Sequence, residues 1–120
     1  MLVNFSNHGS DGWSAEQLAA AGQWGDIVDI AFPNVPADAD ERAILMLADE
    51  YCSKICSFAP NAVLVQGEMS LSFAVVTRLR SKGVVSLCAS SERVCDVSIA
   101  EDGSTVRRSV FRFVRFREYI

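Results

Sequence analysis

Four short apolar runs that alternate with helix-like segments constrain the fold of this chain more than any other sequence feature. The runs are LVNFS (2–6), IVDIAF (27–32), AVLV (62–65) and VVSLCA (84–89). Such apolar runs are typical of strands buried on both faces. Strands that alternate with helices form a parallel sheet with a helical layer on each side. We therefore predict an α/β fold with a mostly parallel sheet.

The segments between these runs carry helix signals. A capping box at Ser14 predicts a short helix before the second strand. A second capping signature at 38–41 precedes apolar positions at helical spacing, and Pro60 closes that helix. Ser70 is expected to cap a third helix that ends at Gly83.

A hairpin is expected at the end of the chain. Residues 94–99 and 105–116 are predicted to be strands, and the turn signal at 101–104 joins them. Residues 90–93 are expected to form a loop before this hairpin. The complete prediction is a single domain, residues 1–120, folded as a Rossmann-like three-layer sandwich with a C-terminal antiparallel hairpin.

Length and composition support one globular domain. The chain has 120 residues, and half of them are hydrophobic, which suffices for its own core. No apolar run approaches the roughly 20 residues that a membrane span needs. The start of the sequence lacks the basic head and apolar stretch of a signal peptide. We expect a cytoplasmic protein without a membrane partner.

Charge is distributed unevenly along the chain. Residues 1–50 contain nine acids and one base, residues 51–120 contain six acids and ten bases, and the net charge is −4. An acidic protein binds duplex nucleic acid poorly, so no such partner is expected. Five arginines between 107 and 117 could still bind a small anion. The alternative is that they line the solvent side of an edge strand.

The four cysteines do not define a site. Cys52 and Cys56 lie four residues apart on a predicted helix, and Cys88 and Cys95 follow later. A metal site is the alternative, but no C-x-x-C pair and no nearby histidine completes one. We expect four reduced, small buried thiols, with no metal and no cofactor.

Polar loops follow the strands at the edge where open α/β sheets bind ligands. If the strand order is 2-1-3-4, the loops after the first and third strands flank a crevice there. The candidate residues are Ser6, Asn7 and His8 after the first strand, Gln66, Gly67 and Glu68 after the third, and Ser90, Ser91 and Arg93 after the fourth.

Each group leaves two interpretations open. His8, the only histidine, could transfer a proton or donate to a phosphate, or it could be a loop residue without a role. Gly67 could let backbone N–H groups approach an anion at a helix N-terminus, or it could only form a tight turn. The two serines beside Arg93 could form an anion cradle or a hydrated loop.

Several well-known site motifs are missing. The sequence contains no G-x-G-x-x-G, no G-x-x-x-x-G-K-[ST] and no G-x-S-x-G. Ordinary dinucleotide binding, P-loop nucleotide hydrolysis and α/β-hydrolase chemistry are therefore not expected.

The order of strands, polar loops and helices resembles a known family. The segments NFSNH, AVLVQGEMSLSFAVVTRLRSKG and VVSLCASSER resemble the small single-domain Rossmann-like proteins of type III CRISPR loci, which are similar to the CARF domains that sense cyclic oligoadenylates. The resemblance implies cyclic oligoadenylate binding and, as in some single-domain members, ring-nuclease activity. It places the ligand contacts on the loops named above, with His8 and Arg93 as catalytic residues.

The implied reaction uses the ligand's own ribose 2′-OH, which attacks the adjacent phosphorus and leaves a 2′,3′-cyclic phosphate. A symmetric ligand suits a homodimer, and Phe111, Phe113 and Phe116 supply apolar surface that a regular strand would divide between two faces. Two alternatives remain. One is a small-molecule enzyme with His8 and Glu68 or Glu92 as an acid–base pair, and the other is a non-catalytic nucleotide-sensing or interaction module.

Overall fold

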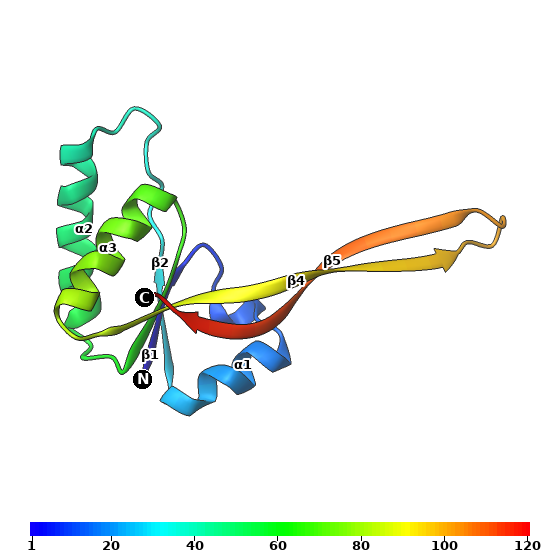
Figure 1. Ribbon diagram of the computed structural model, residues 1–120, viewed down its shortest axis with the longest axis horizontal. Coiled ribbons are helices and arrows are strands. Elements are labelled where there is room, and N and C mark those ends of the chain that lie inside the picture. Colours follow the sequence, from blue (N-terminus) through cyan, green and yellow to red (C-terminus); the bar gives the residue numbers. More distant parts are fainter.

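The computed structural model describes residues 1–120 and has the predicted α/β architecture (Figure 1). None of its helices is long and apolar enough to cross a membrane. The elements in chain order are β1 (Leu2–Ser6), the 3-10 helix η1 (Ser10–Gly12), α1 (Ala15–Ala21), the 3-10 helix η2 (Gly22–Trp24), β2 (Ile27–Ala31), α2 (Glu41–Cys56), β3 (Ala62–Gln66), α3 (Met69–Ser81), β4 (Val85–Ile99) and β5 (Thr105–Glu118).

The five strands form one mixed sheet in the order β2-β1-β3-β4-β5. The pairs β1–β2, β1–β3 and β3–β4 are parallel, and β4–β5 is antiparallel. The chain crosses from β1 to β2 on one side and then from β2 to β3 on the other side, so the topological switch point lies between β1 and β3. The first four strands therefore have the order 2-1-3-4, which is the condition for a crevice between the loops after the first and third strands.

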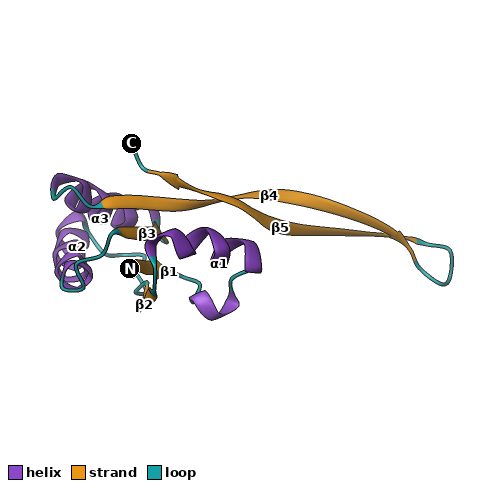
Figure 2. Ribbon diagram, turned by 90° about the horizontal axis from the view of Figure 1, so that it is seen from below, coloured by secondary structure: helices purple, strands orange, loops and turns teal.

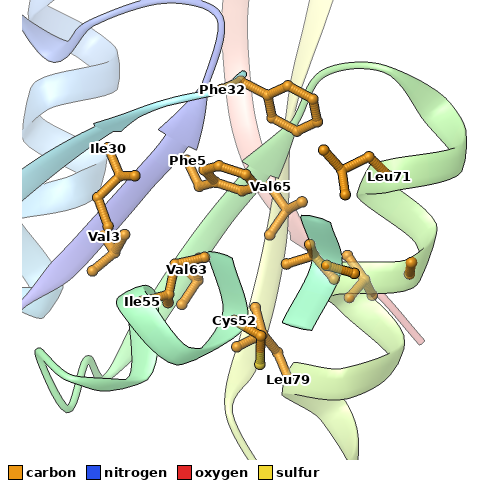
Figure 3. Packing of buried hydrophobic residues seen from close by; sticks show 14 of the residues in the cluster. Val3, Phe5, Ile30, Phe32, Cys52, Ile55, Val63, Val65, Leu71 and Leu79 are labelled. Atoms are coloured by element: carbon orange, nitrogen blue, oxygen red, sulfur yellow. The ribbon is translucent and has the colours of Figure 1, made fainter. Parts of the chain in front are cut away.

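Alternate residues of the central strands face opposite helical layers, as a pleated strand requires. Val3 and Phe5 belong to the larger core cluster under α2 and α3, whereas Leu2 and Leu64 belong to the smaller cluster on the α1 side. In the larger cluster the rings of Phe5 and Phe32 stack with their centroids 4.6 Å apart (Figure 3). The sandwich therefore has the two helical layers that the sequence predicts.

The C-terminal hairpin extends far beyond the sheet. β4 pairs with β3 only from Val85 to Leu87, and then continues with β5 alone (Figures 1 and 2). The expected loop at 90–93 is wrong, because those residues lie within β4 and pair with β5. The turn after Ile99 is confirmed, since the amide of Ala100 donates to the carbonyl of Ser104. We call residues 91–113 the arm.

A β-bulge at the base of the arm corrects a second expectation. Ser90 pairs with Arg115 and Ser91 with Phe113, so Val114 is an extra residue in β5. This insertion brings Phe113 and Phe116 onto the same side of the sheet, where their ring centroids lie 4.9 Å apart. The three phenylalanines of β5 therefore share one face, contrary to the prediction for a regular strand.

Candidate functional site

A crevice of about 740 Å³ lies at the carboxyl ends of β1 and β3, on the α1 side of the switch point. This is the edge at which open α/β sheets bind ligands, and the volume is in the range of small-molecule sites. The lining residues come from the loop after β1, the start of α1, β3 and the base of the arm. They are Ser6, Asn7, His8, Gly12, Trp13, Ser14, Gln17, Leu64, Gln66, Gly67, Ala89, Ser91, Phe111 and Phe113.

A partly buried hydrogen-bond network, centred on the buried Asn4 and Ser6, holds the loop that carries His8. The Asn4 amide donates to the carbonyl of His8 and to Asp29 Oδ1, both at 2.8 Å. The Ser6 hydroxyl donates to Asn4 Oδ1 at 2.7 Å and accepts the His8 amide at 3.3 Å. The His8 main chain is thereby fixed while its imidazole stays exposed at the crevice. Because the main chain is fixed and the ring is free, the imidazole can approach a bound ligand without loop rearrangement.

Asp29 on β2 completes this network. Its carboxylate also accepts the hydroxyl and the amide of Ser10, at 2.8 and 3.1 Å. Desolvation raises the pKa of Asp29, but the hydrogen bonds from Asn4 and Ser10 outweigh it, and the net shift is downward. Sequence reasoning missed Asn4 and Asp29. The available signal was one polar residue in the middle of each of two apolar strands, which the parallel register places side by side.

Gln66 joins β3 to β4 at the point where the two strands separate. The last backbone pair between them is Leu64 with Leu87, and the Gln66 side-chain oxygen then accepts the amide of Ala89 at 2.9 Å. This bond replaces the next rung of the ladder. It keeps the base of the arm beside β3 and so forms one side of the crevice.

Gly67 and Glu68 do not provide the anion site that one interpretation predicts. The Gly67 amide donates to the Ser72 hydroxyl at 3.2 Å. The Glu68 carboxylate accepts the amides of Ser70 and Leu71 at 3.0 and 2.8 Å, so Glu68, and not Ser70, caps α3. These bonds, first that from Leu71 and then those from Ser70, lower the pKa of Glu68. The N-terminus of α3 is occupied by its own cap.

The predicted cluster at 90–93 is divided by the alternation of β4. Ser91 faces the crevice, whereas Ser90 lies on the opposite face, within 3.4 Å of Arg117 Nη2. Arg93 does not line the crevice. Its guanidinium lies over the ring of Phe111, 5.4 Å from the centroid, and so stands at the outer rim.

Three aromatic side chains that sequence reasoning did not assign to the site line the crevice, together with the apolar Leu64 and Ala89. Trp13 precedes α1, and Phe111 and Phe113 come from β5. Trp13 and Phe113 are supported from behind by Phe116, with ring centroids 6.1 and 4.9 Å from it. The remaining polar lining groups are hydroxyls, amides and one imidazole, and none of the lining side chains is a carboxylate. The crevice therefore combines flat apolar rings with neutral hydrogen-bonding groups.

Potential metal ligands are not gathered anywhere in the chain. No three His, Cys, Asp or Glu side chains come close enough to hold one ion. All four cysteines are free, but only Cys52 is fully buried, and Cys95 is exposed. The expectation of four buried thiols is wrong for Cys95, because the arm has solvent on both faces.

Comparison with known proteins gives one match. A family model described as the uncharacterized protein MJ1673 family matches residues 1–117. No curated protein and no solved structure matches the chain. Because the match covers nearly the whole sequence, the chain belongs to the uncharacterized protein MJ1673 family.

Proposed function

We propose that the crevice binds a nucleotide, and that the ligand is the cyclic oligoadenylate that the sequence resemblance implies. The observation that carries the proposal is the composition of the crevice: three aromatic rings, neutral donors and acceptors, and no carboxylate among the lining residues. Aromatic rings stack on any nucleobase, and a site without carboxylates does not repel a phosphate.

The base is expected to stack on Trp13, Phe113 or Phe111. Phe116 supports the first two rings from behind, so they are held before the ligand arrives. Phe111 is 74% exposed and offers a free ring at the rim. Ring faces that are ordered in advance lose little entropy on binding, which favours affinity.

The phosphate is expected near the amides and hydroxyls of Asn7, Gln17 and Ser91. Arg93 brings a positive charge to the rim of the crevice, where its guanidinium is stacked on Phe111. Its role in this proposal is to attract the anionic ligand and to contact a phosphate that extends past Phe111.

Cleavage would follow from the position of His8. The ribose 2′-oxygen attacks the adjacent phosphorus, the bond from phosphorus to the 5′-oxygen breaks, and a 2′,3′-cyclic phosphate and a 5′-hydroxyl result. The His8 imidazole can accept the proton of the attacking hydroxyl or donate one to the leaving oxygen. The Asn4–Ser6 network fixes the main chain of His8, and with it the position from which the imidazole would act.

The alternative acid–base pair receives less support. Both Glu68 oxygens are engaged at the N-terminus of α3, and Glu68 does not line the crevice. Glu92 alternates with Ser91 and Arg93 on β4 and therefore faces the other side of the arm. Neither carboxylate is placed beside His8 at the crevice.

Binding and cleavage of labelled cyclic oligoadenylates test the proposal. Phe113→Ala should weaken binding about 5- to 150-fold, because one base–aromatic stack is worth roughly 1–3 kcal/mol. Phe58→Ala removes a ring at the far end of α2 and should leave affinity unchanged. His8→Ala should slow cleavage about 100-fold with little loss of binding. Equal affinity of the wild type and of alanine variants at each of the three rings, Trp13, Phe111 and Phe113, would exclude this crevice as the binding site.

A further inference from the structure

The arm has no hydrophobic core of its own. It is a two-stranded ribbon whose residues Val97, Ile99 and Phe111 are 59%, 79% and 74% exposed. An isolated two-stranded hairpin is marginally stable in water, because it cannot bury its apolar side chains. A ribbon of this length therefore needs a partner surface.

The molecule exposes more surface than a compact chain of its mass. Its accessible area is 7850 Å², whereas a folded 13.1 kDa monomer is expected to expose about 6,400 Å². The radius of gyration is 17.2 Å, against about 13.6 Å expected for 120 residues. The excess is about 1,450 Å². If the two faces of the arm share this excess equally, covering one face would bury about 700 Å², close to the ~800 Å² that each partner contributes to a standard protein interface.

The charge of the arm favours a protein partner. Its four acids (Glu92, Asp96, Glu101, Asp102) balance its four bases (Arg93, Arg107, Arg108, Arg112). Two of the acids lie at the tip, where a ribbon that enters a nucleic-acid groove would need positive charge. The balanced charge and the exposed apolar residues are those of a surface that packs on protein.

The two faces of the arm differ in chemistry. The face shared with the crevice, here the front face, carries the pairs Ser91–Phe113, Arg93–Phe111, Cys95–Ser109, Val97–Arg107 and Ile99–Thr105. The back face carries Glu92, Asp96, Arg108 and Arg112 between its valines. Covering the back face would desolvate four charged side chains in each copy, whereas the front face has two arginines and the larger exposed apolar groups.

We propose that two copies of the chain dimerise by stacking the front faces of their arms, antiparallel, around a two-fold axis. Full overlap of the nine-pair ribbon places its middle pair, Cys95–Ser109, on that axis. Cys95 and Ser109 both have small side chains, whereas each neighbouring pair of the front face contains an arginine. The two ribbons can therefore approach each other closely at the axis. The same symmetry lays Arg93 over the partner's Val97, and the partner's Arg107 over Phe111.

This dimer adds a residue to the crevice. Phe111 lines the crevice at its rim, and the partner's Arg107 would lie over Phe111. A second guanidinium, in addition to that of Arg93, would then stand at a crevice whose lining residues include no arginine. The inference stands on the arm alone and does not depend on the proposed ligand, but it would explain how a crevice with neutral walls attracts an anion.

Light scattering after size-exclusion chromatography tests the assembly. The wild type should give about twice the chain mass of 13.1 kDa. Val97→Lys on the front face should raise the dimer Kd by about 100-fold or more, because its ammonium group would be buried against the partner's Arg93 and beside Arg107 of its own chain. Val110→Lys makes the same change on the back face, where the side chain is 50% exposed, and should remain dimeric. Circular dichroism should show both variants folded.

Cross-linking identifies the axis. A short bis-maleimide should link two wild-type chains through Cys95, and Cys95→Ser should abolish the link while Cys88→Ser keeps it. A monomeric wild type at high concentration, or dissociation by Val110→Lys and not by Val97→Lys, would overturn the proposal. So would a monomer whose arm binds single-stranded RNA. A dimer that fails to bind any cyclic oligoadenylate would refute the proposed function and leave the dimer standing.

Discussion

Replacing Gly67 by alanine tests how the end of β3 is built. A Cβ at this position would lie 2.6 Å from three atoms of the Phe32 ring, closer than side-chain carbons approach one another. The backbone of Gly67 is not in the left-handed region, so no conformational strain opposes the substitution. Without the clash, alanine would stabilise the fold by about 0.4–1 kcal/mol through the unfolded state. A lower free energy of unfolding in Gly67→Ala would therefore indicate the clash, and a higher one would indicate its absence.

The Phe32 ring has little room to move away. It is 9% exposed, and its face stacks on Phe5 at 4.6 Å (Figure 3). Overpacking of such a site costs roughly 1–3 kcal/mol, so we expect a net loss of about 1–2 kcal/mol after the unfolded-state gain is subtracted. Part of the strain should move Gln66 and so displace the side of the crevice.

Urea unfolding followed by tryptophan fluorescence measures this loss, with Trp13 and Trp24 as the reporters. A double-mutant cycle with Phe32→Leu isolates the contact, because the smaller side chain removes the ring that alanine would meet. In the Phe32→Leu background, Gly67→Ala should be neutral or stabilising. A Gly67→Ala protein as stable as the wild type, or an equal loss in both backgrounds, would refute the packing argument.

Three further predictions follow from the site. The pKa values of Asp29 and Glu68 are lowered in the folded state, so both carboxylates stabilise the fold. This stabilisation is full above their ordinary pKa values of 3.8 and 4.5 and is lost as the pH falls through the lowered values. In the double variant Asp29→Asn and Glu68→Gln, the free energy of unfolding should therefore depend less on pH below about pH 5. Gln66→Ala should cost about 1 kcal/mol and speed hydrogen exchange at the Ala89 amide, while exchange at Leu87 stays slow. In the Val97→Lys variant, whose arm is expected to be uncovered, iodoacetamide should modify Cys95 first and Cys52 last, since burial raises the pKa of the Cys52 thiol and shields it. Peptide mass spectrometry measures the order, and modification of Cys52 before Cys95 would contradict this prediction.

The central sheet could be predicted because burial on both faces leaves a strong signal. A run such as AVLV at 62–65 must be a strand inside the sandwich, and its neighbours repeat the pattern. The hairpin turn at 101–104 could also be predicted, because the turn requires a positive φ that glycine adopts readily. Gly103 supplies it. These elements depend on local chemistry, which the sequence contains in full.

The candidate site could be predicted only in part. Ser6, Asn7, His8, Gln66 and Gly67 line the crevice at the ends of β1 and β3, as predicted. Ser91 also lines it, but from within β4, whereas Glu68, Ser90 and Arg93 do not line it. Glu68 was misread because a carboxylate two residues before Ser70 is an equally good helix cap, and only the geometry of the first turn decides between them. The residues SSER at 90–93 resemble a loop because a ribbon with solvent on both faces has no hydrophobic alternation.

The aromatic wall of the crevice depends on a single inserted residue. Without Val114 as an extra residue in β5, Phe113 and Phe116 would point to opposite sides of the sheet, and the ring pair that supports the crevice could not form. No local sequence signal marks this bulge, since its formation is decided by pairing with Ser90 and Ser91, more than twenty residues earlier. The same bulge turns the apolar face of the arm toward the crevice. One register shift thus connects the ligand site to the surface on which we expect a second copy to pack.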